Sequence, residues 1–170
     1  MALSACYRFC SATFLIAIVM LGASWEICAQ RFTSPAETAR HDPWNKTQVI
    51  VPEALAKVIA GPASKKPLLI CVGFDDRYGE GHIPGAQFIG PGSKAEGIEG
   101  LKAWARGVSR AQPVVLYCGC CAIKDCPNIR PAFQALRQMG MTRVKVLYLE
   151  DTFEKNWAEK GFPVEKGGKK

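Results

Sequence analysis

The sequence predicts an α/β domain with a mostly parallel, five-stranded sheet and helices on both of its faces. Short apolar, β-branched runs alternate along the chain with stretches of helical periodicity, which is typical of parallel sheets with right-handed crossovers. Residues 68–72, Leu-Leu-Ile-Cys-Val, are apolar at every position, as expected for a strand buried on both faces. The chain has 170 residues, of which 48% are hydrophobic and 22% charged, and this is enough for one such domain with a full core.

The elements follow one another in a regular order. The strands are predicted at residues 47–51, 68–72, 87–89, 114–117 and 144–149. The helices are predicted at residues 52–59, 95–108, from near 127 to 140, and 152–160. Proline or glycine marks helix ends, as Pro52 and Gly61 do for the first helix.

The connection between the second and third strands holds His82, the single histidine of the predicted folded part. A catalytic role is one interpretation of this residue. We instead expect its ring to fix a turn-rich segment by hydrogen bonds, while Gly85 supplies a special backbone angle. Cys71, within the apolar run, is expected to be a small core residue.

The first 29 residues are predicted to be a signal peptide. Arg8 precedes an uncharged run over residues 9–25 with an apolar centre, and small residues follow, which is the pattern of a secretory signal. We therefore expect an exported protein, periplasmic or secreted, whose thiols meet an oxidising compartment. The alternative is a retained N-terminal membrane anchor, and only in that case is membrane contact expected.

Composition divides the rest of the chain. Residues 30–46 are polar without a period and are predicted to be a linker or N-terminal arm, residues 47–166 form the folded domain, and residues 167–170 are a basic tail. The net charge of +7 is scattered and forms no basic stripe interleaved with aromatic residues. We expect no nucleic-acid partner.

Four of the eight cysteines lie in one short segment, residues 118–126, which we call the cysteine loop. The fourth predicted strand runs directly into it, and ligands of parallel sheets bind at the carboxyl ends of strands. The N–H groups ahead of the following helix are expected to lower the pKa of Cys118, with Lys124 and Arg130 adding positive charge. For Arg130, a solvated or salt-bridged helix residue is an equally good interpretation.

Several segments together carry a family resemblance. They are Pro52-Glu53-Ala54-Leu55, Gly81-His82-Ile83-Pro84-Gly85-Ala86, Val115-Leu116-Tyr117-Cys118, and Trp157 with Gly161, Pro163 and Val164. In this order and spacing they resemble a rhodanese domain over residues 47 to 166. The resemblance implies a five-stranded parallel α/β sheet and a sulfurtransferase in which Cys118 is the catalytic nucleophile.

In that family the cysteine takes sulfane sulfur from a donor such as thiosulfate or a persulfide and passes it to cyanide or a thiol. The resemblance implies that the backbone of Gly119, Cys120 and Cys121 cradles the anion, and Lys124 and Arg130 are the expected helpers. The expected partners are a small sulfur-containing donor and a thiol acceptor, with a redox protein as a further candidate. No cofactor and no metal is expected for this activity.

The sequence departs from the family pattern at two places. Cys71-Val72-Gly73 replaces the usual Asp-Val-Arg, so an ion pair that normally braces the domain is missing. The active loop is also longer than the common form, with Cys120, Cys121 and Cys126 inserted before the helix.

These extra thiols leave a second function open. Cys121 or Cys126 can act as a resolving thiol that forms a disulfide with Cys118, which makes the loop a thiol-redox device. The four cysteines Cys118, Cys120, Cys121 and Cys126 can also form a non-catalytic module that is held by disulfides or binds a soft metal. Phosphatase activity is not expected. The phosphatases of this fold have an arginine six positions after the catalytic cysteine, and it binds the oxyanion with two hydrogen bonds. Counted from Cys118, that position is Lys124, which cannot bind in this way.

Overall fold

The structure is a computed structural model that describes residues 42–168. The predicted signal peptide, the first part of the predicted arm and the last two residues of the tail lie outside the described residues. Within residues 42–168, no helix is both long enough and apolar enough to span a membrane.

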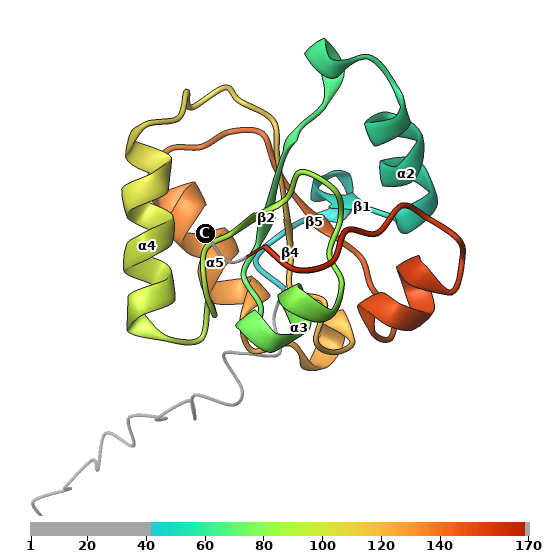
Figure 1. The fold of residues 1–170 in the computed structure, drawn as a ribbon. Helices are drawn as coiled ribbons and strands as arrows, with labels where there is room; N and C mark the ends of the chain where they lie inside the picture. Colours follow the sequence, from blue (N-terminus) through green and yellow to red (C-terminus); the bar gives the residue numbers. More distant parts are fainter. Residues whose placement is uncertain (1–41, 169–170) are drawn as a thin grey trace, which may run out of the picture. The chain divides into compact units, whose positions relative to one another are not determined.

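The predicted fold is confirmed. One sheet has the strand order β1-β5-β4-β2-β3, and every neighbouring pair is parallel (Figure 1). Its strands are β1 (Val49–Ile50), β2 (Leu68–Cys71), β3 (Gln87–Phe88), β4 (Val114–Tyr117) and β5 (Val144–Leu147).

The helices agree with the predictions at three places and differ at two. The α-helices are α2 (Pro52–Ala60), α3 (Asp75–Glu80), α4 (Ala95–Arg106) and α5 (Ile129–Gln138). Single turns are η1 (Lys46–Gln48), η2 (Ala63–Lys65), η3 (Ile123–Asp125) and η4 (Glu154–Ala158). The helix predicted at 152–160 is one π turn, η4, and α3 was not predicted because Tyr78 is its only buried residue.

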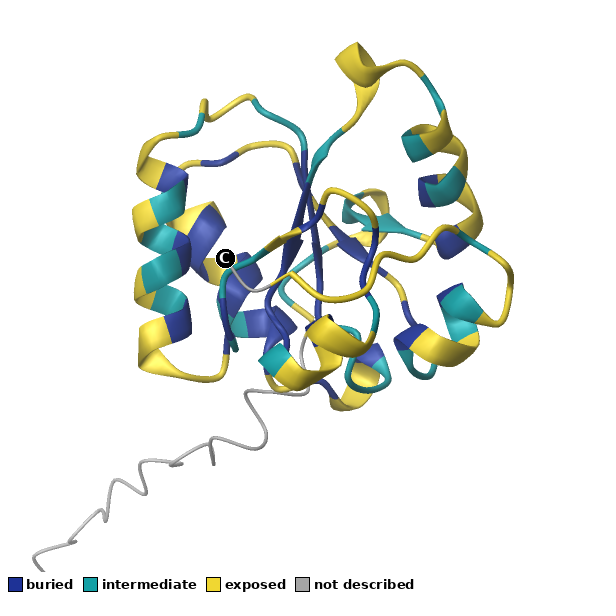
Figure 2. Ribbon diagram, in the orientation of Figure 1, coloured by how far each residue is buried: buried dark blue, intermediate teal, exposed yellow. Residues whose placement is uncertain are grey.

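Two hydrophobic cores flank the sheet (Figure 2). One lies between the sheet and the pair α4 and α5, and the other lies under α2 and η4. The side chains of β4 alternate between them, since successive residues of a strand point to opposite faces. Val114 and Leu116 join the α4/α5 core, whereas Val115 and Tyr117 join the other one. This alternation places Cys118, the next residue, on the α4/α5 side.

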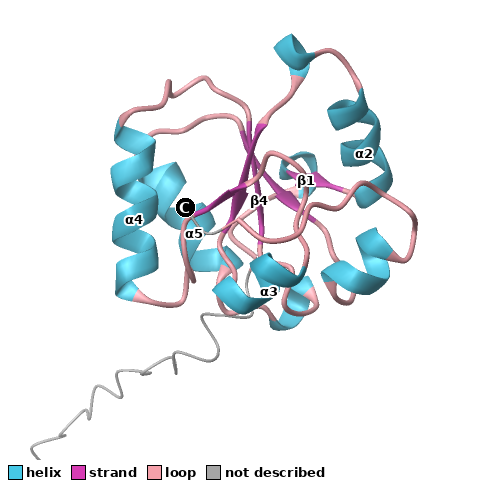
Figure 3. Cartoon of the chain, in the orientation of Figure 1, coloured by secondary structure: helices cyan, strands magenta, loops and turns pink. Residues whose placement is uncertain are grey.

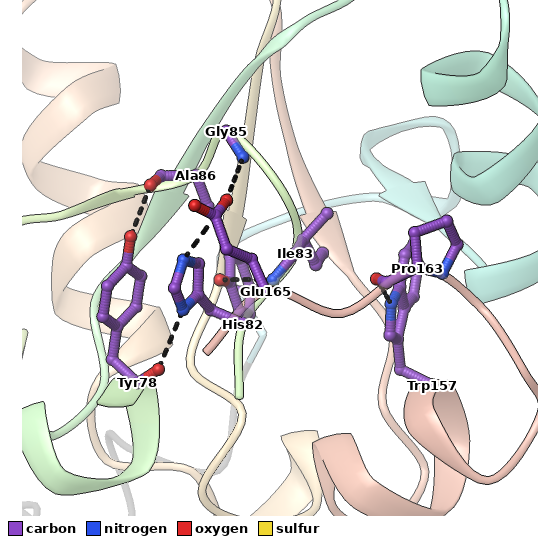
Figure 4. Close-up of polar contacts among 9 residues, drawn as sticks. Tyr78, His82, Ile83, Gly85, Ala86, Trp157, Pro163 and Glu165 are labelled. Carbon is purple, nitrogen blue, oxygen red and sulfur yellow. Dashed lines mark hydrogen bonds and ion pairs between the residues drawn. The ribbon is translucent and has the colours of Figure 1, made fainter. Parts of the chain in front are cut away.

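The predicted structural role of His82 is confirmed (Figure 4). Its ring is buried, stacks on Tyr78 at 3.8 Å between ring centroids, and places Nδ1 2.9 Å from the Tyr78 carbonyl oxygen. Its backbone forms an antiparallel bridge with Glu165. Gly85 has φ +77°, the left-handed conformation expected for this glycine. His82 therefore ties the turn to the C-terminal segment.

Candidate active site

The cysteine loop follows β4 at the carboxyl edge of the sheet, where the segment after β2 also lies (Figure 3). The sulfur atoms of Cys118, Cys120, Cys121 and Cys126 all lie within 4.8 Å of one another. The Sγ atoms of Cys118 and Cys120 are 3.0 Å apart, and those of Cys120 and Cys121 are 3.4 Å apart. Cys118 and Cys126 are buried, and the other two are half-buried. The fold thus gathers all four loop thiols into one cluster, which we call the thiol cluster.

The cysteine loop packs closely against the end of β2. The Cys71 Sγ lies 3.7 Å from the Cys118 carbonyl oxygen, and a Cβ built at Gly73 would overlap that same oxygen. The glycine that replaces the usual arginine is therefore what allows this approach. Burial raises the pKa of Cys71 to about 12, so this thiol stays neutral, which confirms it as a core residue.

Replacing Gly73 with alanine should displace Cys118. The added methyl group forces the Cys118 carbonyl away from β2, and overpacking of this kind costs roughly 1–3 kcal/mol. We expect the loss in chemical denaturation, together with an altered alkylation rate of the cluster. Gly79→Ala is the matched control, because no atom of the described part of the chain lies within 4 Å of a Cβ at Gly79. Equal stability of the two variants would show that the approach to Cys118 is not tight.

Asn128 is the site residue that the sequence analysis missed. It is fully buried, and its Nδ2 donates to Cys118 Sγ at 3.2 Å and points at Cys120 Sγ at 3.9 Å. Its Oδ1 accepts from the Ser93 N–H at 3.0 Å, which fixes the orientation of the amide. An asparagine directly before a helix is a sequence signal for an N-cap. Here the side chain does not cap α5 and instead stabilises the cluster.

The Arg130 side chain holds the cysteine loop in place by hydrogen bonds to backbone carbonyl groups of the loop. The buried guanidinium donates to the carbonyl oxygens of Ile123 and Cys126, both at 3.1 Å, and to that of Lys124 at 3.3 Å. It also pairs with Asp42 at 2.6 Å and lies 5.6 Å from the ring centroid of Trp44. The first described residues of the predicted arm thus contact the loop through Arg130.

Lys124 is exposed, and its ammonium lies 4.0 Å from the Asp125 carboxylate. The structure thus gives Arg130 a bracing position and leaves Lys124 at the surface. The anion-binding role expected of these two residues stays a prediction. Of the predicted anion cradle, the Cys120 N–H faces the Cys118 sulfur. The N–H groups of Asn128 and Ile129, at the start of α5, face the Cys126 sulfur.

The negative charge of the cluster resides on Cys120, which corrects the expectation that the loop lowers the pKa of Cys118. Hydrogen bonds from Cys118 and then Cys126 lower the pKa of Cys120 to about 2. The hydrogen bond with Cys120, followed by that with Cys126 and by burial, raises the pKa of Cys118. Cys120 is less buried than Cys118, so its thiolate is the less costly one to keep. One thiolate is therefore shared through hydrogen bonds with neighbouring thiols.

The cluster should consequently be alkylated in acid. An ordinary cysteine, with a pKa near 8.5, is almost fully protonated at about pH 5 and reacts slowly. With the Cys120 pKa at about 2, its thiolate is lost only as the pH falls through that value. We expect the iodoacetamide rate to stay nearly flat between about pH 5 and pH 7 and to map to Cys120. A tenfold fall per pH unit over this range, or unchanged reactivity of Cys120→Ser, would contradict this assignment.

Two hollows adjoin the cluster. An open cavity of about 190 Å³ is lined by Gly119 and Cys120 together with residues of α3 and η4. A hollow of about 10 Å³ is lined by Cys118, Cys121 and Cys126 with apolar neighbours, and it is close in size to one water molecule. Larger hollows lie elsewhere, including one of about 460 Å³ beside His82. The thiols thus border one small hollow and one larger cavity, and both are partly open to solvent.

Comparison with known proteins bears directly on this arrangement. The sequence model of the rhodanese-like domain family matches residues 52–157 of this chain. No curated protein matches the sequence. A Bacillus halodurans protein of known structure is 21% identical and has a TM-score of 0.53, with 77% of this chain and 80% of that chain covered.

Two further structures share the fold. The rhodanese-like domain of an Anabaena protein is 21% identical and has a TM-score of 0.51, with 70% of this chain and 79% of that chain covered. The thiosulfate sulfurtransferase of Pseudomonas aeruginosa is 19% identical and has a TM-score of 0.53, with 79% of this chain but only 22% of that longer chain covered. The matched model spans more than half of the sequence, and the chain therefore belongs to the family of rhodanese-like domains.

Proposed function

We propose that this protein is a sulfurtransferase that carries sulfane sulfur as a persulfide on Cys118. The observation that carries the proposal is the position of Cys118 at the carboxyl end of β4, with the Cys120 sulfur 3.0 Å away. Membership of the family supports the same role, and one structural neighbour is a thiosulfate sulfurtransferase.

The first half of the reaction loads the sulfur. The reactive form of the cluster is the minor one, in which the proton shared by the two sulfur atoms lies on Cys120 and Cys118 is the thiolate. The Asn128 amide stabilises the charge on Cys118 in that form. The Cys118 thiolate attacks the outer sulfur of thiosulfate, the sulfur–sulfur bond of the donor breaks, and sulfite leaves with its electron pair. The new persulfide lies beside the small hollow lined by Cys121 and Cys126.

The second half unloads the sulfur. An acceptor thiolate or cyanide enters from the open side near Gly119 and attacks the outer sulfur of the persulfide. The sulfur–sulfur bond on Cys118 breaks, the acceptor keeps the sulfur, and Cys118 leaves as a thiolate that is protonated again from Cys120.

We propose that the chain is exported, which is supported by the signal-like pattern at residues 1–29.

Intact mass of the purified protein, with and without thiosulfate and then with reductant, tests the proposal. We expect a gain of about 32 Da, one sulfur atom, which reductant removes and Cys118→Ser lacks. An adduct that persists in Cys118→Ser, or no adduct on the fully reduced protein, would overturn the proposal.

A thiol-redox role is the second candidate, and the mutual approach of the four sulfur atoms favours it. In that case an oxidised partner disulfide would take two electrons from the cluster and leave Cys118 in a disulfide with one neighbour. The same mass experiment separates the two functions, because this reaction removes two hydrogens and adds no sulfur. Treatment with a dithiol would then restore them.

A further inference from the structure

We propose that the thiol cluster is also a binding site for a single soft metal ion, Zn²⁺ or Cu⁺, held by the sulfur atoms of Cys118, Cys120, Cys121 and Cys126. The inference does not depend on sulfur transfer. It concerns the same four atoms, however, so a bound ion and a sulfane sulfur would compete for Cys118.

The distances between the sulfur atoms fit one ion. Four thiolates about 2.3 Å from a zinc ion form a tetrahedron with edges of about 3.8 Å. In this structure all four Sγ atoms lie within 4.8 Å of one another, with two of the separations at 3.0 and 3.4 Å. Changes of about 1 Å or less in these separations are therefore enough to reach the spacing of metal ligands.

The ligand set selects a soft ion. The four converging groups are all thiols, and within residues 42–168 no carboxylate or imidazole joins them. Thiolates prefer Zn²⁺ and Cu⁺, whereas Mg²⁺ and Ca²⁺ require oxygen ligands. The hollow of about 10 Å³ between Cys118, Cys121 and Cys126 leaves room for one bare ion and not for a hydrated one. The site is therefore suited to an ion that exchanges its water for sulfur.

The surroundings hold the ligands in place before an ion binds. Arg130 fixes three carbonyl groups of the cysteine loop, and the Ile123 N–H donates to the Leu149 carbonyl at 2.8 Å. At the other end of the loop, the Phe153 N–H donates to the Gly119 carbonyl at 3.1 Å. A loop that is already ordered loses little conformational entropy on binding, which favours affinity.

The surroundings also compensate charge. Four thiolates around Zn²⁺ carry a net charge of −2, which must be stabilised at a mostly buried site. The Asn128 side-chain amide donates to Cys118, and the Cys120 N–H also faces Cys118. The backbone N–H groups of Asn128 and Ile129 face Cys126. Such outer hydrogen bonds to the ligands are a regular part of metal sites and raise their affinity.

The test uses the full chain with Cys6, Cys10 and Cys28 replaced by serine, reduced and kept free of oxygen and of sulfur donors. Co²⁺ serves as the optical probe, followed by displacement with Zn²⁺ and by a separate Cu⁺ titration against a chromophoric chelator. We expect a thiolate-to-cobalt absorption band that saturates at one ion per chain and disappears when zinc is added. The chelator competition then shows whether Zn²⁺ or Cu⁺ is held more tightly.

Serine variants of the four cysteines report on each ligand. Each single variant should lower the band by about a quarter and weaken zinc binding by more than about 10²-fold. The variants are Cys118→Ser, Cys120→Ser, Cys121→Ser and Cys126→Ser. Cys71→Ala is the control, since Cys71 lies outside the cluster and should keep both the band and the affinity. Circular dichroism of each ion-free variant verifies that it is folded.

The outcomes separate this inference from the proposed sulfur transfer. Absence of the band in the folded, reduced protein, or an undiminished band in the four variants, would overturn the metal site and leave sulfur transfer intact. If the protein binds cobalt but never gains sulfur from thiosulfate, the metal site would be supported and the proposed sulfurtransferase activity would be ruled out.

Discussion

Cys118→Ser is expected to lower the rate of sulfur transfer from thiosulfate by at least about 10³-fold, because the nucleophile that forms the persulfide is lost. A serine hydroxyl is far too weak an acid to be ionised by the neighbouring Cys120 thiolate, so no alternative nucleophile stands at this position. The measurement is the steady-state rate with thiosulfate and cyanide, together with the free energy of unfolding.

The other cysteines sharpen this test. Cys120→Ser removes the group that accepts the Cys118 proton and should cost about 10²-fold, the usual size of an acid–base contribution. Cys126→Ser should keep more than about a tenth of the rate. Cys71→Ala, outside the cluster, shows how much stability the loss of a buried thiol costs by itself. If Cys118→Ser and Cys126→Ser lost stability together while the rate changed little, the cluster would be structural.

The parts of the fold that the sequence predicts are those encoded locally. The continuous apolar run at 68–72 and the alternation of strands with helices identify the parallel sheet, since each signal lies within a few residues. The position of Cys118 at the carboxyl end of β4 follows from the same reasoning. By contrast, α3 has one buried residue, Tyr78, whose hydroxyl donates to the Ala86 carbonyl at 2.6 Å. Tertiary contact, not periodicity, stabilises that helix.

The chemistry of the site was less predictable, because it depends on contacts between distant parts of the chain. Arg130, an expected anion ligand, also pairs with Asp42, 88 residues away, and no local pattern in the sequence predicts this contact. The separations between the four sulfur atoms decide which thiol is ionised, and no spacing in the sequence contains them. The position of Asn128 directly before a helix predicts an N-cap, but the packing of β4 against α5 directs its amide to the cluster.

Asn128→Asp is the substitution with the largest effect expected outside the cysteines. The change keeps the shape of the side chain and the Oδ1 that accepts from Ser93, but it replaces the donor to Cys118 with an acceptor. A carboxylate about 4 Å from a thiolate raises the energy of the ionised pair by roughly 4 kcal/mol at the effective dielectric constant of a protein. At 1.36 kcal/mol per tenfold change, this corresponds to about 10²- to 10³-fold less Cys118 thiolate.

The rate of sulfur loading should fall by that factor in Asn128→Asp, and the acid alkylation of Cys120 should fall with it, because both sulfur atoms face the same amide. Raising the pH should recover part of the loading rate of the variant, because the carboxylate raises the pKa of the thiols and their ionised fraction therefore grows as the pH rises. Asn128→Ser, which is neutral, separates the charge from the lost packing and should retain more of the loading rate than the aspartate variant. An aspartate variant that loads sulfur as fast as the parent would mean that the Cys118 thiolate forms without help from position 128.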